Sequence, residues 1–168
     1  MVDANVETVN LFSTQFKNYQ HAILPSLPFK NNFFDIIHCS HVVEHLQPEI
    51  LYQTIQEVDR CLKTDGYFII SAPLLTDFFY NDLSHIKPYN PEVFLKYLSA
   101  NYGQNNLSRS KISSAYQKVK LVFRYKKEYI ISGNFNFFIS FILKVLKKMV
   151  ICKYLKTGFT LVLKKQNN

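Results

Sequence analysis

Glycine is scarce in this chain of 168 residues. There are only four, and no two lie within ten residues of each other: Gly66, Gly103, Gly133 and Gly158. The glycine-rich loops that bind phosphates or dinucleotides need two or more glycines within one short turn. The sequence therefore excludes a loop of either common glycine-rich pattern within this chain.

Cysteine is also scarce, and no continuous apolar run approaches the ~18 residues that a membrane-spanning helix requires. The three cysteines are odd in number and far apart: Cys39, Cys61 and Cys152. This pattern favours reduced thiols in a cytoplasmic protein over a disulfide framework. Apolar residues make up 48% of the chain and charged residues 19%, which allows a buried core.

Acidic residues are almost absent from the last third of the chain. Residues 1–100 carry a balance of −5, whereas residues 101–168 carry +13, with Glu128 as the one acidic residue there. A basic region of this kind favours an anionic partner such as a phosphorylated molecule or a membrane surface. The alternative is a solvated lysine-rich surface. Nucleic acid is disfavoured, because the basic stretch lacks interleaved arginine and stacking aromatic residues.

Apolar runs of strand length alternate with amphipathic segments of helix length, which predicts an α/β fold. The run from Phe33 to Cys39 is almost wholly apolar and is typical of a strand buried on both faces. His38 within it is predicted to be a hydrogen-bonded core residue. We predict helices over about 7–16, 48–62, 90–98 and 135–155, and strands over about 1–3, 19–24, 33–39, 67–71, 119–123 and 160–163.

An ordered series of short sequence words resembles the class I S-adenosylmethionine (SAM)-dependent methyltransferases, in the small-molecule group called type 11. The words are Leu27-Pro28-Phe29, Phe34-Asp35-Ile36-Ile37, Ser40-His41-Val42-Val43-Glu44-His45-Leu46, Leu62-Lys63-Thr64-Asp65-Gly66-Tyr67-Phe68-Ile69-Ile70-Ser71, and His85-Ile86-Lys87-Pro88-Tyr89. The segment Thr157 to Lys165 is similar to the last, antiparallel strand of that family. Each word is weak alone, and their common order and spacing carry the resemblance.

The resemblance implies a Rossmann-like sheet, mostly parallel with an antiparallel last strand. It also implies that this chain is a single partial methyltransferase domain over residues 1–168. The matching positions start at the second strand, so the first strand, its glycine loop and the first helix of the family are expected to be missing. The strand Phe33–Cys39, which pairs with that first strand in the family, would then have an exposed edge where a second copy or a partner chain could pair.

The resemblance also implies roles for individual residues. Asp3 matches the acidic position that binds the ribose hydroxyls of SAM, and Ser40 follows a strand end where the cofactor lies. His41 would border the cofactor or act as a base on the acceptor, with Glu44 setting its tautomer; alternatively, both side chains only cap the start of a helix. His85 and Tyr89 are candidate acceptor-binding residues, or else surface and packing residues.

The function that the resemblance implies is methyl transfer from SAM to a small, lipid-like molecule. The alternative is a non-catalytic remnant, or one half of a split methyltransferase that needs a partner chain.

A second pattern overlaps the first. His41-Val42-Val43-Glu44-His45 also spells H-x-x-E-H, the signature of one class of zinc proteases. On a helix, His41 and His45 would share one face and bind a metal, with Glu44 as the base. His85 and Glu92 are candidates for the third ligand that a zinc site requires. The methyltransferase words account for the pattern better, so the sequence predicts no metal.

A basic and aromatic insert is predicted at about 129–156, before the final strand. Its segment Phe135 to Lys153 combines clustered lysines with aromatic bulk, which is typical of a helix that binds an anionic membrane surface. The competing interpretation is a lid or packing segment over an acceptor site. A membrane span is disfavoured by the internal lysines.

Overall fold

The computed structural model describes residues 1–16, 18–102, 108–129 and 152–167. Its elements, with η for a 3-10 helix, are β1 (Val2–Asp3), α1 (Val6–Ser13), β2 (Gln20–His21), β3 (Phe34–Ser40), η1 (Val43–His45), α2 (Pro48–Cys61), β4 (Leu62–Pro73), η2 (Phe79–Asn81), α3 (Pro91–Leu98), β5 (Tyr116–Tyr129) and β6 (Cys152–Lys165). Helices α1 and α2 are interspersed among the strands from β1 to β4, which confirms the predicted α/β fold.

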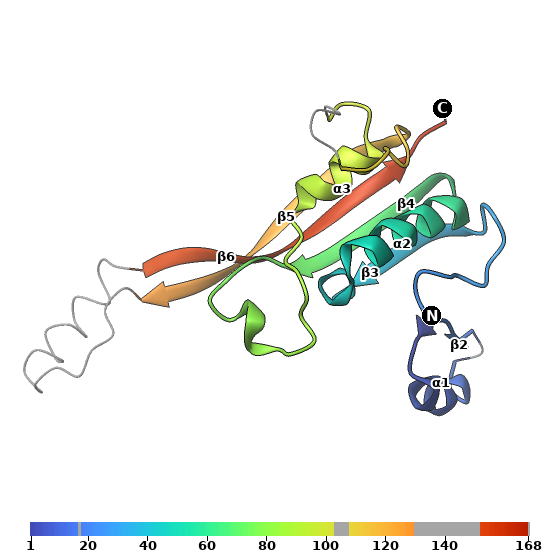
Figure 1. Cartoon of the computed structure of the whole chain (residues 1–168), viewed down its shortest axis with the longest axis horizontal. Coiled ribbons are helices and arrows are strands. Elements are labelled where there is room, and N and C mark those ends of the chain that lie inside the picture. Colours follow the sequence, from blue (N-terminus) through green and yellow to red (C-terminus); the bar gives the residue numbers. More distant parts are fainter. Residues whose placement is uncertain (17, 103–107, 130–151, 168) are drawn as a thin grey trace, which may run out of the picture.

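The strands form two separate sheets. β1 and β2 make a short parallel pair, and the other four strands form a sheet in the order β3-β4-β6-β5. β3 and β4 are parallel, whereas β6 runs antiparallel to both β4 and β5, as predicted for the last strand. Figure 1 shows the unit of β1, α1 and β2 beside the β3 side of the larger sheet. The edge of β3 that faces away from β4 has no strand partner among the described residues.

The sequence accounts for where helix α2 begins and which side chains it buries. Pro48 stands in the first turn, where its missing N–H costs nothing, and apolar residues then recur with helical spacing. The side chains that α2 buries are Leu51, Thr54, Ile55, Val58 and Cys61. Leu51, Ile55 and Val58 belong to one core cluster, to which β4 and β6 contribute Phe68, Ile70, Phe159, Leu161 and Leu163.

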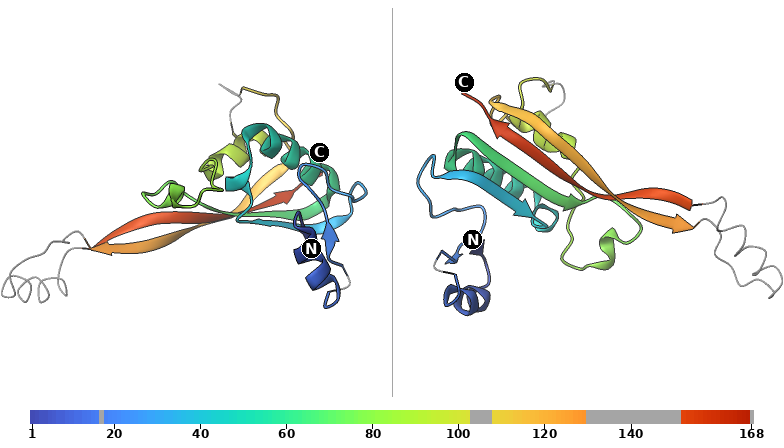
Figure 2. Two further views of the ribbon diagram at one scale, coloured as in Figure 1. Left: turned by 60° about the horizontal axis from the view of Figure 1, so that its bottom comes forward. Right: turned by 180° about the vertical axis from the view of Figure 1, so that it is seen from behind.

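Helices α2 and α3 cover the same face of the larger sheet. Figure 2 shows α2 and α3 on one side of the four strands, while α1 contacts β1 and β2. β3 is therefore not buried on both faces, and that prediction is wrong: Ile36 is 58% exposed. His38 is likewise exposed and not a core residue, although its Nε2 lies 3.4 Å from the Ser71 hydroxyl oxygen, within hydrogen-bonding distance.

Strands β5 and β6 are much longer than their apolar cores at 119–123 and 160–163 indicate. They form a hairpin that extends well beyond the helices in Figure 2. The predicted insert at about 129–156 therefore begins and ends inside these strands. Residues Cys152 to Leu155 belong to β6 and not to a helix, because they continue the ladder with β5. The rest of the helix predicted at 135–155, and most of Phe135 to Lys153, lies outside the described residues.

Strand β4 begins at Leu62, directly after α2, and its residue Asp65 adopts a left-handed φ of 64°. The next residue, Gly66, is required by the space around it. A Cβ at that position would lie 2.9 Å from the backbone oxygens of Asp35 and Lys63, so only glycine fits the approach of β3 to β4.

Helix α3 begins at Pro91 as predicted. Asn90 has the extended backbone of an N-cap residue, but its side chain makes no capping hydrogen bond. The buried positions of α3 are Pro91, Phe94, Leu95 and Leu98. No helix in the described residues is long and apolar enough to cross a membrane.

Candidate functional site

The carboxyl end of β3 turns sharply into η1. The N–H of His41 donates to the backbone oxygen of Ser71 at 2.8 Å, which continues the pairing with β4, and His41 then adopts φ 53°. Positive φ is uncommon for a residue with a Cβ, and histidine is among the residues that tolerate it best. This turn directs the chain from an open sheet end, where ligands bind in α/β folds, into η1. Ser40 is exposed at the same end.

Glu44 lies almost completely buried in η1, with 1% of its surface exposed. The Nδ1 of His41 lies 3.1 Å from Glu44 Oε1, the geometry of an N–H that donates to a carboxylate. The other carboxylate oxygen, Oε2, is buried and has no hydrogen-bond partner. The prediction that Glu44 sets the tautomer of His41 is consistent with this geometry.

Arg124 on β5 completes the arrangement from the opposite side. Its Nη1 lies 3.3 Å from His41 Nε2, and its Nη2 donates to the backbone oxygen of Ala72 at 3.0 Å. A guanidinium only donates hydrogen bonds, so the facing Nε2 must carry a lone pair. In these contacts Nε2 of His41 is the acceptor from Arg124 and Nδ1 is the donor to Glu44. The sequence offered no signal for Arg124, which is 83 positions away.

Asp3 is the last residue of β1, and one oxygen of its carboxylate already accepts a hydrogen bond from a neighbouring residue. Oδ1 accepts the N–H of Asn5 at 2.8 Å, and Asn5 in turn caps α1. The residue is half-buried, and the second oxygen of its carboxylate remains for another partner. A carboxylate in this place suits the ribose hydroxyls of SAM. The described residues provide no glycine-rich backbone cradle for the amino-acid end of the cofactor, so they fit only one part of SAM.

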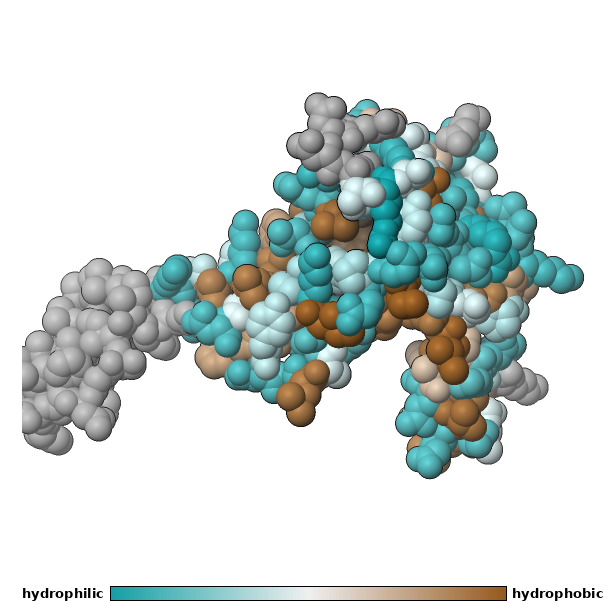
Figure 3. Space-filling model, viewed as in Figure 1, coloured by the Kyte–Doolittle hydropathy of each residue, from teal (hydrophilic) through white to brown (hydrophobic). Residues whose placement is uncertain are grey.

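A cavity of about 440 Å³ separates the β1–β2 pair from the free edge of β3. Figure 3 shows the unit of residues that carries β1 and β2 projecting from the body of the molecule. The walls are largely apolar and include Val2, Leu27, Phe29, Phe34 and Ile37. The gap between the two sheets is thus an accessible hollow next to the strand edge.

The two candidate acceptor residues have different environments. Tyr89 is 5% exposed and part of the core, and its hydroxyl donates to the backbone oxygen of Leu46 at 3.0 Å. Burial raises the pKa of Tyr89, and Arg109 partly offsets the change. His85 is half-buried, and its Nδ1 donates to the backbone oxygen of Phe79 at 2.6 Å. The structure therefore does not bring the two side chains together at one open surface, and their role in acceptor binding stays a prediction.

The protease-like use of H-x-x-E-H requires a helix that the structure does not have. His41 precedes η1 with positive φ, and η1 is a single 3-10 turn over Val43–His45, so His41 and His45 do not share a helix face. His85 instead comes close to Glu44 and His45. Neither His41 nor Glu92 belongs to that group among the described residues.

Cys39 and Cys61 are free thiols. Burial raises the pKa of Cys39 to about 12, and the nearby charge of Glu44 acts in the same direction. Burial also raises the pKa of Cys61 and outweighs the charge of Arg60, which lowers it. Because the thiolate is the reactive form, both are poor nucleophiles.

One family model matches the first part of the chain. The type 11 model described as a methyltransferase domain matches residues 1–70. A comparison with curated proteins found no significant match.

Solved structures extend the likeness over the rest of the chain. A SAM-dependent methyltransferase from Archaeoglobus fulgidus is similar with a TM-score of 0.65 and 21% identity, covering 98% of this chain and 74% of that one. YcgJ from Bacillus subtilis gives 0.58 and 16% identity over 99% and 81% of the two chains. A SAM-dependent methyltransferase from Methanosarcina mazei gives 0.55 and 15% over 99% and 81%. At these identities the structures establish the fold alone. Residues 1–70 thus match the sequence model of the type 11 methyltransferase domain, and the chain has the fold of SAM-dependent methyltransferases.

Proposed function

We propose that this chain acts in methyl transfer from SAM to a small molecule that binds beside His41 at the carboxyl end of β3. The observation that carries the proposal is the oriented imidazole. Glu44 holds Nδ1–H from a buried position, and Nε2 faces Arg124 at the carboxyl end of β3. The family match supports the reaction class.

In this proposal some residues bind the cofactor and others take part in proton transfer. SAM, when bound, supplies a methyl group already activated by its sulfonium, so the protein mainly has to align the acceptor. Asp3 would hold the ribose, with Ser40 close to the same ligand. His41 Nε2 would accept a proton from the acceptor, and Arg124, only weakly bonded to it at 3.3 Å, would turn aside. Glu44 would stabilise the resulting imidazolium.

Titration of SAM into the purified full chain tests this assignment by calorimetry. We expect saturable binding in the micromolar range, weakened about 10–100-fold in Asp3→Asn, because a charged hydrogen bond to the ribose contributes about 1.5–3 kcal/mol. Asp77→Asn is the matched control, since Asp77 is an exposed carboxylate on the loop after β4. Absence of saturable binding, or equal affinity in the two variants, would contradict the proposal.

A lipid-like acceptor is the finer part of the proposal. The outer part of the β5–β6 hairpin carries lysines next to aromatic side chains: Lys126 lies 4.5 Å from the ring centre of Phe78, and Lys156 lies 4.2 Å from that of Phe123. Tyr125 and Tyr154 are more than half exposed. Cations beside aromatic groups favour the surface of an anionic membrane.

Sedimentation with lipid vesicles tests this membrane contact. We expect the chain to bind phosphatidylglycerol vesicles and not phosphatidylcholine vesicles, with weaker binding in Lys126→Glu/Lys156→Glu. Lys30→Glu/Lys96→Glu, with the same charge change on other elements, is the control. Equal binding to both lipids, or no binding, would argue against a membrane-bound acceptor.

The alternative function, half of a split methyltransferase, is favoured by the cavity beside β3. A strand from a second copy of this chain would pair with the free edge of β3 and fill the apolar hollow. Light scattering during gel filtration tests this pairing. We expect a dimer or larger assembly that Ile36→Lys dissociates, whereas Val119→Lys, on the opposite edge strand, does not. A monomer at all concentrations, or equal effects of the two lysines, would exclude self-pairing at β3.

A further inference from the structure

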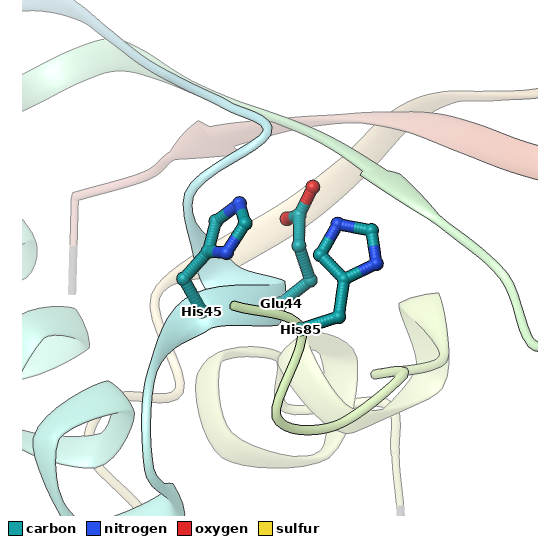
Figure 4. A group of neighbouring side chains, drawn as sticks. All are labelled: Glu44, His45 and His85. Atoms are coloured by element: carbon teal, nitrogen blue, oxygen red, sulfur yellow. The ribbon is translucent and has the colours of Figure 1, made fainter. Parts of the chain in front are cut away.

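Three potential metal ligands meet between η1 and the loop that follows η2. Glu44 and His45 come from η1, and His85 comes from the loop (Figure 4). One ligand atom from each residue lies within 4.8 Å of the other two. In Figure 4 the Glu44 carboxylate lies between the two imidazole rings. The methyl-transfer proposal uses neither His45 nor Oε2 of Glu44.

The backbone holds this group in place without a ligand. The N–H groups of Ile86 and Lys87 both donate to the backbone oxygen of Glu44, at 2.8 and 3.3 Å. These bonds attach the loop to η1 and bring His85 beside His45, with ring centres 4.9 Å apart. Phe79 packs against the other side of His85 at 4.6 Å. The group is therefore preorganised by contacts that do not involve its ligand atoms.

The hydrogen bonds of the two histidines leave the correct atoms available. Nδ1 of His45 lies 3.0 Å from the backbone oxygen of Ser84, and Nδ1 of His85 lies 2.6 Å from that of Phe79. A carbonyl oxygen only accepts, so each Nδ1 carries the proton and each Nε2 carries a lone pair. A backbone carbonyl that orients the far nitrogen is the usual support for a histidine metal ligand.

The buried carboxylate gives an independent reason to expect a cation. Glu44 is 1% exposed, and its Oε2 has no hydrogen-bond partner. A buried polar atom without a partner is costly and rare, and for a carboxylate oxygen the cost is greater than for a neutral group. His41 already takes Oε1. A cation shared with the two histidines would give Oε2 the partner that it lacks.

We propose that Glu44, His45 and His85 form a site for a divalent transition metal of the zinc type. Two imidazole nitrogens and one carboxylate oxygen are the ligands that zinc prefers, whereas Mg²⁺ and Ca²⁺ prefer oxygen alone. Ligands of a tetrahedral zinc at about 2.0–2.1 Å lie roughly 3.4 Å apart, so atoms now within 4.8 Å of one another would move together by at most about 1.4 Å on binding. The fourth position remains for water or another ligand. The metal would join η1 to the loop before α3.

Titration of ZnCl₂ into the metal-free full chain, in a buffer that does not chelate zinc, tests the site by calorimetry and thermal unfolding. We expect one Zn²⁺ per chain with a Kd in the micromolar range or below, and a rise in Tm on saturation because the ion binds the folded state. Mg²⁺ at the same concentrations should leave the Tm unchanged. With Co²⁺ in place of zinc, visible d–d absorption is expected to appear at the same stoichiometry.

Variants separate this site from adventitious binding. His45→Ala and His85→Ala should each weaken zinc binding at least 10-fold, and Glu44→Gln should do so while keeping a side chain of the same size. His21→Ala removes a histidine from β2, away from the group, and should bind zinc like the parent chain. The two histidine variants keep the test valid if Glu44→Gln fails to fold. The proposal is wrong if zinc does not bind at 100 µM, or if binding is unchanged in both His45→Ala and His85→Ala.

Discussion

Gly158 on β6 leaves room for the guanidinium of Arg124, its direct partner across the β5–β6 ladder. A Cβ at residue 158 would overlap the Nη2 and Nε atoms of Arg124 and lie 2.9 Å from the backbone oxygen of Ala72. Arg124 donates to that same oxygen and faces His41. The absence of a side chain on β6 therefore positions a cation next to the imidazole at the end of β3.

Gly158→Ala should displace Arg124 and destabilise the chain. We expect the free energy of unfolding to fall by about 1–3 kcal/mol, the usual cost of overpacking, and the NMR signals of the His41 ring to shift. In an Arg124→Ala background the cost of Gly158→Ala should be smaller, with only the contact to Ala72 remaining. Urea unfolding of the four proteins measures this coupling. Equal costs in both backgrounds would mean that Gly158 does not position Arg124.

The positive φ of His41 leads to a separate prediction. His41→Gly and His41→Ala both remove the contacts to Glu44 and Arg124, but only glycine adopts φ 53° without a steric cost. We expect His41→Gly to be the more stable by about 1 kcal/mol, the reverse of the usual order of alanine and glycine. The same pair at His38, within β3, is the control and should favour alanine. Urea unfolding measures the stability of the four variants. If the alanine variant were the more stable one at residue 41 as well as at residue 38, the positive φ of His41 would be wrong.

Glu57 and Arg60 on α2 hold the segment before β3. Glu57 accepts the N–H of Leu27 and two hydrogen bonds from Arg60, which itself donates to the backbone oxygens of Leu27 and Phe29. The hydrogen bonds from Arg60 are the main cause that lowers the pKa of Glu57.

This lowered pKa predicts a loss of stability in acid. The stabilisation is complete above the unfolded pKa of glutamate, about 4.3, and is lost as pH falls through the lower folded value. The free energy of unfolding should therefore decrease between about pH 5 and pH 3, and by less in Glu57→Gln. Glu7→Gln on α1 is the control, and urea unfolding at each pH is the measurement. An identical acid slope in parent and Glu57→Gln would contradict the prediction.

Asp59 on α2 connects this helix to the two strands β5 and β6. Its Oδ1 accepts from the hydroxyl of Tyr116 at 2.9 Å and from Nζ of Lys165 at 3.0 Å. Burial, followed by the charge of Asp59, raises the pKa of Tyr116, so the hydroxyl remains a donor at high pH.

Tyr116→Phe should cost about 1–2 kcal/mol in the free energy of unfolding, because the half-buried carboxylate of Asp59 loses one donor. Tyr154→Phe, which removes a hydroxyl from a side chain that is 63% exposed, should have almost no effect. Urea unfolding at pH 7 compares the two. If both variants were as stable as the parent chain, the contact to Asp59 would contribute nothing.

Local sequence determined most of the regular elements. Pro48 and the apolar stripe after it define α2, and Asn90-Pro91 marks the start of α3. Ser40, His41 and Glu44 could be placed together because they are neighbours along one strand end. Short-range periodicity and turn chemistry carry such information, since they depend on residues only a few positions apart.

Contacts between distant residues decided the rest. Arg124 reaches His41 only because β6 places β5 beside that end of the sheet, and His85 reaches Glu44 only because the loop bonds to η1. The apolar run of β3 indicated burial on both faces, yet both α2 and α3 pack on the same side. The sequence by itself determined the α/β fold class, the order of most strands and helices, and the residues at the end of β3. Only the tertiary structure decided which strand edge and which face remain open, and which side chains surround Glu44, because these depend on how the elements pack.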